Sequence, residues 1–324
     1  MSAVGMSLDE FIASGESERD DIVPGILPTG GFLVLAGRER SFKTFLAIQL
    51  MFSVTTGEPF LGSRPTRQGS ALYVSEEGVR SKVAKRFATI RKAYPTVEAN
   101  DLRILFRQQV SLDEGQSWQY VTSEVDRMTA PALVVLDNLS VLMTGDEDKK
   151  SDMMAAIRPA QDLISQYGVT VLLVHHVAKS ANGRLNKQMR GSSALPAAAD
   201  GSLGLTRIGE SDLVDLKIEP KDDEGQTLNL RWDADTFLLS VMGHGDVTVA
   251  DVVHAVENLG AEGQPVTRAQ VEAHVGRGKS RVGHLLMQAV ADGVIGRTGS
   301  ARATAYLANR GDTAWTESPS TGRT

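Results

Sequence analysis

A short apolar run, followed at once by a polar loop that ends in lysine and threonine, constrains this chain more than any other feature. Residues 32–36 read FLVLA, as in strands that are buried on both faces of a sheet. A helical pattern begins where the loop ends, and the whole resembles the phosphate-loop pattern G-x-x-x-x-G-K-[ST]. We therefore predict a strand, a phosphate-binding loop and a helix in succession. The loop residues are Gly37, Arg38, Glu39, Arg40, Ser41, Phe42, Lys43 and Thr44.

Each position of such a loop has its own physical task. Backbone N–H groups of the loop and of the helix N-terminus point at phosphate oxygens. Lys43 would neutralise charge on the β- and γ-phosphates, and the Thr44 hydroxyl would complete a Mg²⁺ shell, so ATP and Mg²⁺ are the predicted ligands. Phe42 stands where glycine is usual. If this position needs a positive φ, phenylalanine is strained; if a helical φ suffices, its side chain can point away from the phosphates.

Two later apolar runs end in acidic residues. The run at 133–136 is followed by Asp137, which we expect to hold the Mg²⁺ water shell; the alternative is an aspartate that caps a turn. The run SALYVS is followed by two glutamates. A glutamate at the end of the neighbouring strand can polarise the water that attacks the γ-phosphate. Glu77 is the first choice and Glu76 the second, although either can be a plain surface charge.

Paired histidines, His175 and His176, follow the apolar run at 169–174. No third ligand lies at a suitable spacing for zinc, and the absence of cysteine excludes thiolate metal sites, disulfides and cysteine nucleophiles. We predict that His176 senses the γ-phosphate or the attacking water. The alternative is a partly buried histidine with satisfied hydrogen bonds.

Strands and helices alternate through the first two thirds of the chain, which predicts an α/β fold with a mostly parallel sheet. Beyond residue 200 short strands follow one another, which indicates an antiparallel extension of the same sheet. The expected strands are 32–36, 70–75, 102–106, 133–136, 169–174, 202–206, 213–218, 227–231 and 237–241. The expected helices are 44–54, 81–93, 118–128 and 152–167.

A change of composition near residues 243–246 predicts a domain boundary. Three helices and a hairpin are expected beyond it, at 247–259, 268–275, 280–292 and 293–307, with Thr267 capping the second helix; this order is typical of a winged helix. The predicted domains are a lead-in at 1–24, an ATPase domain at 25–243, a winged helix at 246–310 and a disordered tail at 311–324.

The chain has a net charge of −6 over 324 residues. That charge argues against a generally basic coat for nucleic acid, although a local basic face can still bind it. No apolar run approaches the roughly 20 residues that cross a bilayer, and the acidic N-terminus does not read as a secretory signal. We expect a soluble cytoplasmic protein with no membrane partner.

The order of motifs GRERSFKT, SEEG, LVVLDN, LLVHH and RGSSAL, over roughly residues 20–242, resembles the RecA-like ATPases of the RepA type. These are hexameric replicative helicases of some plasmids, with AAA-family relatives in phages and actinobacteria. The resemblance implies a ring, expected to hold six copies, with ATP between subunits in a bacterial or phage-infected cell. It assigns Glu77 to catalysis, Asp137 to Mg²⁺ and His176 to the sensor position.

The resemblance also places a DNA-contacting loop at 178–193, facing the channel of the ring. This loop carries basic residues and no acidic one, as backbone binding to single-stranded DNA requires. The alternative is a solvated loop. Its basic residues are Lys179, Arg184, Lys187 and Arg190.

Ring ATPases of this kind use a cation that reaches into the neighbour's site. Related helicases take it from a lysine–x–arginine element on a late strand, which this chain lacks. Arg207, Lys217 and Lys221 are the candidates. Without one of them, both trans-activated hydrolysis and the helicase interpretation become weaker.

The expected third helix of the C-terminal domain begins with basic residues, Arg277, Lys279 and Arg281. In winged helices the corresponding helix enters the major groove of duplex DNA. Arg297 and Arg302 would lie on the wing, near the sugar-phosphate backbone. The competing interpretation is that this domain mediates protein contacts.

These observations favour an ATP-hydrolysing motor that acts on DNA, with ring-forming helicase or translocase activity in replication or recombination. The alternative is an ATP-gated DNA-binding regulator, or a recombination accessory protein, that does not unwind DNA. A small-molecule kinase is disfavoured because no arginine-rich lid is evident.

Overall fold

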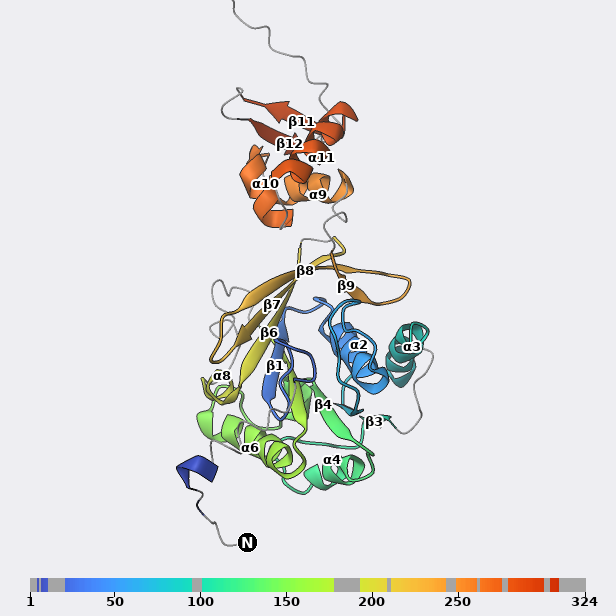
Figure 1. The fold of residues 1–324 in the computed structure, drawn as a ribbon, viewed down its shortest axis with the longest axis vertical. Helices are drawn as coiled ribbons and strands as arrows, with labels where there is room; N and C mark the ends of the chain where they lie inside the picture. Colours follow the sequence, from blue (N-terminus) through green and yellow to red (C-terminus); the bar gives the residue numbers. More distant parts are fainter. Residues whose placement is uncertain are drawn as a thin grey trace, which may run out of the picture. The chain divides into compact units, whose positions relative to one another are not determined.

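The computed structural model describes residues 5, 7–10, 21–94, 101–177, 193–208, 211–242, 249–260, 263–275, 279–299 and 304–308. The chain divides into two compact units (Figure 1). One comprises Met1–Ile208 and Asp212–Val241, and the other comprises Gly209–Ser211 and Met242–Thr324.

Within its described residues, the larger unit contains a nine-stranded sheet in the order β3-β2-β4-β5-β1-β6-β7-β8-β9. The strands from β3 to β6 are parallel, and the pairs β6–β7, β7–β8 and β8–β9 are antiparallel. The predicted α/β sheet with an antiparallel extension is therefore confirmed. The strands are β1 (Phe32–Gly37), β2 (Ser70–Ser75), β3 (Leu102–Phe106), β4 (Pro131–Asp137), β5 (Thr170–His176), β6 (Gly201–Arg207), β7 (Leu213–Pro220), β8 (Gln226–Trp232) and β9 (Leu239–Val241).

Helices cover both faces of the parallel part of this sheet (Figure 1). The four expected helices are present with ends shifted by a few residues, whereas α5 and α8 were not predicted. A helix of four or five residues is too short to display a helical period. The helices are α2 (Lys43–Thr56), α3 (Arg80–Arg91), α4 (Trp118–Val125), α5 (Leu139–Leu142), α6 (Lys150–Tyr167) and α8 (Ala194–Ala198).

Side chains along β1, β2 and β5 alternate between two hydrophobic cores. In β1, Leu33 and Leu35 belong to the core that includes α2 and α3, and Phe32 and Val34 belong to the core that includes α4 and α6. Successive side chains of a strand point to opposite faces, so an apolar run such as FLVLA fills both layers. Full burial of one such side chain stabilises the fold by about 1.5–3 kcal/mol.

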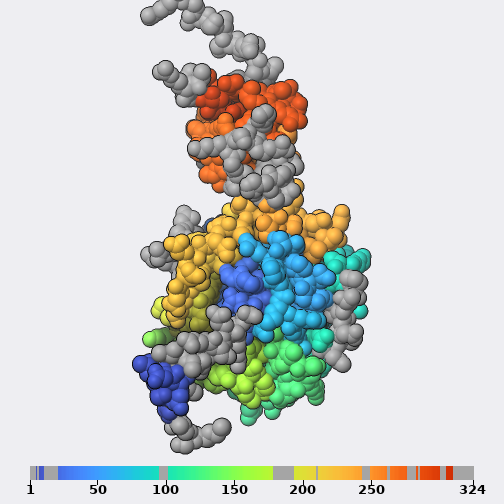
Figure 2. All heavy atoms as spheres, in the orientation of Figure 1, coloured from blue at the N-terminus to red at the C-terminus, as the bar shows by residue number. Residues whose placement is uncertain are grey.

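Helix α2 is joined to the antiparallel extension by a buried glutamine. Gln49 donates from Nε2 to the Leu239 carbonyl over 2.8 Å, and its Oε1 accepts from the Leu239 N–H, also over 2.8 Å. On the face seen in Figure 2, the blue surface of α2 lies directly beside the gold surface of these strands. The helix that follows the phosphate loop is thus anchored to the edge strand β9.

Among its described residues, the smaller unit contains three helices and a three-stranded sheet in the order β10-β12-β11. Thr267 and Gln270 form a reciprocal capping box: the Gln270 N–H donates to Thr267 Oγ1 over 3.3 Å, and the Thr267 N–H donates to Gln270 Oε1 over 2.8 Å. Assignment of this unit as a winged helix stays a prediction. Its elements are α9 (Val249–Leu259), β10 (Val266–Thr267), α10 (Arg268–Val275), α11 (Lys279–Ala291), β11 (Ile295–Thr298) and β12 (Ala305–Ala308).

Every helix in the described part of the chain is too short or too polar to cross a lipid bilayer.

Candidate nucleotide-binding site

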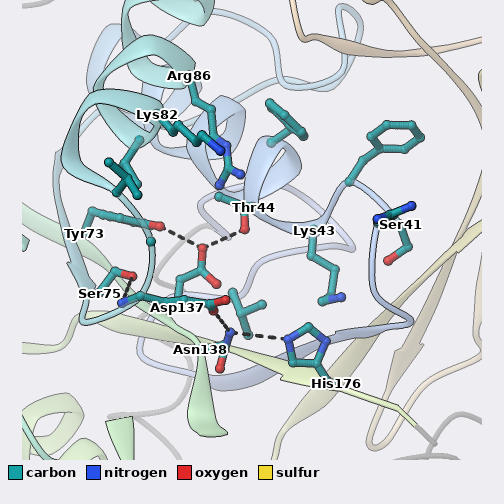
Figure 3. A pocket seen from close by; sticks show the side chains of 18 of the residues that line it. Ser41, Lys43, Thr44, Tyr73, Ser75, Lys82, Arg86, Asp137, Asn138 and His176 are labelled. Carbon is teal, nitrogen blue, oxygen red and sulfur yellow. Dashed lines mark hydrogen bonds between the residues drawn. The ribbon is translucent and has the colours of Figure 1, made fainter. Parts of the chain in front are cut away.

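A cavity of about 370 Å³ opens at the carboxyl ends of the parallel strands (Figure 3). Open α/β sheets bind their ligands at this edge. The cavity brings together side chains that the sequence predicted to act together although they are far apart in the chain. These are Lys43, Thr44, Glu77, Asp137 and His176.

The loop between β1 and α2 begins at a glycine that no other residue can replace without displacement. A Cβ atom on Gly37 would lie 2.5 Å from the Leu205 carbonyl oxygen and 2.6 Å from Ser41 Oγ. The Ser41 hydroxyl is buried and has no hydrogen-bond partner within the described residues. The tight loop, its unsatisfied hydroxyl and the start of α2 form a cradle that fits phosphate oxygens.

Phe42 adopts the left-handed conformation, with φ 69° and ψ 15°. The position therefore needs a positive φ, which costs a residue with a Cβ about 1–2 kcal/mol. Its ring stacks on Trp232 of β8, with centroids 4.4 Å apart, and the Arg207 guanidinium lies 5.1 Å from the ring centroid. An aromatic pair contributes about 0.5–1.5 kcal/mol and a cation–π contact about 0.5–1 kcal/mol, so these contacts offset the strain.

This balance predicts an unusual order of stability for two variants. Phe42→Ala keeps the backbone strain and loses the ring contacts, whereas Phe42→Gly loses the ring contacts but relieves the strain. We expect both to be less stable than the wild type, and the glycine variant to be about 1 kcal/mol more stable than the alanine variant. Urea unfolding of the three proteins measures this. If the alanine variant were more stable than the glycine variant, as at an ordinary helical position, the assignment of backbone strain to Phe42 would be contradicted.

Lys43 is buried, with 6% of its surface exposed. Its ammonium donates to the carbonyl of Gly37 over 2.9 Å and to that of Arg38 over 2.7 Å. Burial lowers the pKa of Lys43 to about 8, and the charges of Asp137, Glu39 and Glu77 act in the opposite direction. The side chain is thus held inside the loop where phosphate would lie.

A pH dependence of nucleotide affinity follows from that pKa. The phosphates favour the charged ammonium, so above about pH 8 binding must first restore a proton to Lys43. We expect affinity for an ATP analogue to be nearly constant below about pH 8 and then to fall by up to about tenfold per pH unit. Fluorescence titration at constant ionic strength measures it. Lys43→Arg, which stays charged, should give a flat profile; a flat wild-type profile would contradict the prediction.

An oxygen cluster lies beside the lysine. Thr44 Oγ1 and the Tyr73 hydroxyl both donate to Asp137 Oδ2, over 2.9 Å and 2.8 Å. Burial raises the pKa of Asp137, whereas the hydrogen bonds from Tyr73 and Thr44 lower it. A hydroxyl and a carboxylate that meet at the cavity are the hard oxygen ligands that suit Mg²⁺, so Thr44 and Asp137 fit this ion.

Tyr73 was not predicted as a site residue, although strand periodicity could have found it. Tyr73 in β2 and Asp137 in β4 extend from the sheet face that carries α2, because each lies an even number of residues from a side chain in that core. A tyrosine between the apolar residues of β2, on the same face as the acidic strand end, was the signal.

The two glutamates after β2 have different environments. Glu76 Oε1 accepts hydrogen bonds from the N–H groups of Gln108 and Val110, over 2.9 Å and 3.1 Å. These bonds hold the loop after β3 in place. Glu77 lines the cavity instead. β2 is the direct neighbour of β4, the strand that ends in Asp137, whereas β4 and β5 separate it from β1. Glu77 reaches the site from beyond these two strands because all the parallel strands end at one edge.

Asn138 joins Glu77 to His176, and its contact with His176 is drawn in Figure 3. Its Nδ2 donates to Glu77 Oε2 over 2.5 Å and lies 3.3 Å from His176 Nε2. Burial and the charge of Lys43 lower the pKa of His176. The imidazole is therefore neutral near pH 7. Asn138 was not predicted as a site residue, although it follows Asp137 directly in the chain.

The paired histidines lie on opposite faces of β5. His176 lines the cavity, whereas His175 is almost completely buried with Nε2 3.6 Å from Glu147 Oε2. The alternation of strand side chains separates them. Sensing by His176 stays a prediction.

Two further cations of the cavity were not predicted. Lys82 and Arg86 lie four residues apart on α3 and reach toward the oxygen cluster (Figure 3). The Arg86 guanidinium also lies 5.3 Å from the centroid of the Phe45 ring. The sequence could have indicated them, because a spacing of four residues places Lys82 and Arg86 on one helix face. This helix begins shortly after the two glutamates that follow β2.

The three candidates for a trans-acting cation are separated in the structure. Arg207 lines the cavity of its own chain. Lys217 forms an ion pair with Glu219 over 2.5 Å, and Lys221 donates to the Ala197 carbonyl over 3.5 Å. Action on a neighbouring subunit stays a prediction for all three.

The predicted DNA-binding residues fall mostly outside the described residues. Lys279 and Arg281 belong to the first turn of α11. Lys179, Arg184, Lys187, Arg190 and Arg277 lie outside the described residues.

Comparison with known proteins agrees with this geometry. Residues 3–182 match the family model described as an AAA domain. DNA repair protein RadA of Haemophilus influenzae is 22% identical over 216 residues, a match that spans 65% of this chain and 40% of RadA. The chain therefore covers less than half of that relative's length.

Two solved structures are similar. One, described as an ATPase domain, superposes with a TM-score of 0.56 at 16% identity, and the match covers 74% of this chain and 100% of that domain. KaiC-like protein PH0186 of Pyrococcus horikoshii OT3 gives a TM-score of 0.48 at 14% identity, over 68% of this chain and 94% of that one. The family match extends over more than half of the chain, and the phosphate loop at the end of β1 lies within it. The chain therefore belongs to the AAA domain family and has the fold of the RecA-like P-loop ATPases.

Proposed function

We propose that this chain hydrolyses ATP and couples hydrolysis to movement on DNA, as a ring of copies of itself. The observation that carries the proposal is the convergence of two hydrogen-bonded groups on one cavity. Lys43 and the Thr44–Asp137–Tyr73 cluster form the first group, and the Glu77–Asn138–His176 chain forms the second.

The first group would hold the phosphates. Lys43 would exchange its two loop carbonyls for oxygens of the β- and γ-phosphates, and the loop amides would donate to the remaining oxygens. Thr44 and Asp137 would hold Mg²⁺, which screens charge on the phosphates when bound. Lys82 and Arg86 add positive charge to the lining of the same cavity.

The second group would act on water. Glu77 would orient the attacking water and accept its proton, which requires an ionised carboxylate facing the phosphates. His176, neutral because burial and Lys43 lower its pKa, can accept or donate a hydrogen bond beside that water. A change in the hydrogen-bond partner of His176 would be passed along the chain to the basic stretch 178–192, because His176 is the last residue of β5.

The DNA part of the proposal is supported by sequence and by the relatives. The stretch 178–192 is basic in an acidic chain. RadA is named as a DNA repair protein, and the chain is similar to it over 216 residues. Together with the site, these features favour a DNA-stimulated ATPase of the helicase or translocase type. The resemblance of the motifs to the RepA type adds the expectation of six copies in the ring, in the cytoplasm of a bacterial or phage-infected cell.

Measurement of the ATPase rate with and without single-stranded DNA tests this proposal. We expect DNA to raise kcat, and native mass measurements to show a closed oligomer with ATP and Mg²⁺. Strand separation of a forked duplex should require hydrolysable ATP. Equal ATPase rates with and without DNA, or unwinding that ignores ATP, would contradict the motor.

The smaller unit favours a second candidate function. Its three helices and hairpin, with α11 beginning at Lys279, are compatible with a DNA-reading module that lets ATP control binding rather than movement. Sequence-selective duplex binding that depends on ATP, by a full chain that separates no strands, would favour this regulator over the motor.

A further inference from the structure

Asn138 is a buried side chain whose amide nitrogen contacts both other members of the proposed water-activating group. It follows the last residue of β4 and exposes 4% of its surface. Within the described residues its amide contacts Glu77 and His176, and its Oδ1 accepts from Ser140 Oγ over 2.6 Å. None of these side-chain hydrogen bonds goes to the phosphate loop.

The chemistry of these partners defines the orientation of the amide. An ionised Glu77 carboxylate only accepts hydrogen bonds, so the NH₂ group of Asn138 must face it. The carbonyl oxygen then faces Ser140, whose hydroxyl donates. Each neighbour therefore satisfies a different part of one amide, and rotation of that amide would break both contacts at once.

The same NH₂ group has a second hydrogen, which lies toward His176. With Nδ2 as the donor, His176 Nε2 must be the acceptor over their 3.3 Å separation, and the imidazole proton resides on Nδ1. A single amide thus sets the direction of the Glu77 carboxylate and the tautomer of His176.

We propose that Asn138 is a positioning residue that holds Glu77 and His176 as one unit and thereby controls the rate of hydrolysis but not nucleotide binding. This inference rests on the proposed function, in which Glu77 acts on the attacking water. Asn138 lines the cavity, but its amide nitrogen contacts Glu77 and His176, so we assign it no contact of its own with the phosphates or the water. Its effect on the rate must therefore pass through these two side chains, and mainly through Glu77, the closer of them.

A double-mutant cycle on the full chain tests this dependence. Single-turnover hydrolysis, with enzyme in excess over ATP, is measured for the wild type, Asn138→Ala, Glu77→Gln and the double variant; binding of a fluorescent ATP analogue is measured in parallel. We expect Asn138→Ala to lower the rate about a hundredfold, the usual cost of a small misplacement of a catalytic group, and to change affinity less than about threefold. In the Glu77→Gln background it should lower the rate less than about twofold further.

Two additional variants separate positioning from folding. Asn138→Ser keeps a donor near Glu77 and should recover part of the rate lost in Asn138→Ala, even if that variant is less stable. Asn229→Ala is the matched control, because Asn229 also donates to a carboxylate, Asp215 Oδ1 over 2.9 Å, outside the cavity. Its rate should equal that of the wild type.

The outcomes distinguish this inference from the function on which it rests. Equal losses from Asn138→Ala in both backgrounds, or a matching loss of affinity, would overturn the positioning role. If Glu77→Gln abolishes hydrolysis while Asn138→Ala retains it, this inference alone fails. A Glu77→Gln variant with a wild-type rate would overturn both.

Discussion

Replacing Lys43 with alanine is expected to weaken ATP binding by about a hundredfold or more and to remove hydrolysis. The ammonium donates to two loop carbonyls in the cradle that phosphate would occupy. Hydrogen bonds to charged groups contribute about 1.5–3 kcal/mol each, and loss of two such bonds to phosphate oxygens accounts for a change of this size. Isothermal titration with an ATP analogue and Mg²⁺, together with a phosphate-release assay, measures both effects.

The loss in this variant should not come from unfolding. Burial of the ammonium lowers its pKa to about 8, so the charge is held in an unfavourable environment, and its removal should leave the unfolding temperature unchanged or raised. Lys149→Ala is a suitable control, because that lysine is exposed and pairs with Asp146 over 3.9 Å. Unaltered affinity and turnover in Lys43→Ala would overturn the assignment of the phosphate site.

Replacing Glu77 with glutamine is expected to separate binding from catalysis. The glutamine side chain has nearly the same shape and can still accept from Asn138 Nδ2, so the cavity should keep its form and bind ATP as the wild type does. It cannot take a proton from water. Hydrolysis should therefore fall about 10²–10⁴-fold, the contribution of a positioned general base.

Glu76→Gln provides the matched comparison for this substitution. Its Oε1 would still accept from the N–H groups of Gln108 and Val110, so we expect hydrolysis close to that of the wild type. Measurement of kcat and of analogue affinity for the three proteins decides between the two glutamates. A large loss in Glu76→Gln with normal turnover in Glu77→Gln would reverse the assignment.

The order of strands and helices could be predicted because it is a local property of the sequence. The apolar run before Gly37 and the lysine and threonine after it define a strand, a turn and a helix with no reference to distant residues. The acidic ends of later strands predicted further site residues, since parallel strands that alternate with helices place all their carboxyl ends at one edge. The cavity brings those predicted side chains together at that edge.

The environment of each side chain depended on contacts between distant segments. The sequence left two explanations for Phe42, and its positive φ with the stack on Trp232 of β8 decided between them. Residue 232 is far from residue 42 in the chain. The preference for phenylalanine at position 42 depends on this distant partner, so the sequence of the loop alone does not reveal it.

Local sequence is thus enough to specify most strands and helices of this protein, the phosphate loop, and the edge of the sheet where acidic and basic groups gather. Folding in three dimensions was needed to show which of two adjacent glutamates and which of two adjacent histidines faces the cavity, and that Asn138 joins Glu77 to His176. This division follows from the range of the interactions. Hydrophobic period and loop chemistry act over a few residues, whereas hydrogen bonds among buried polar groups require strands that meet only after the sheet has assembled.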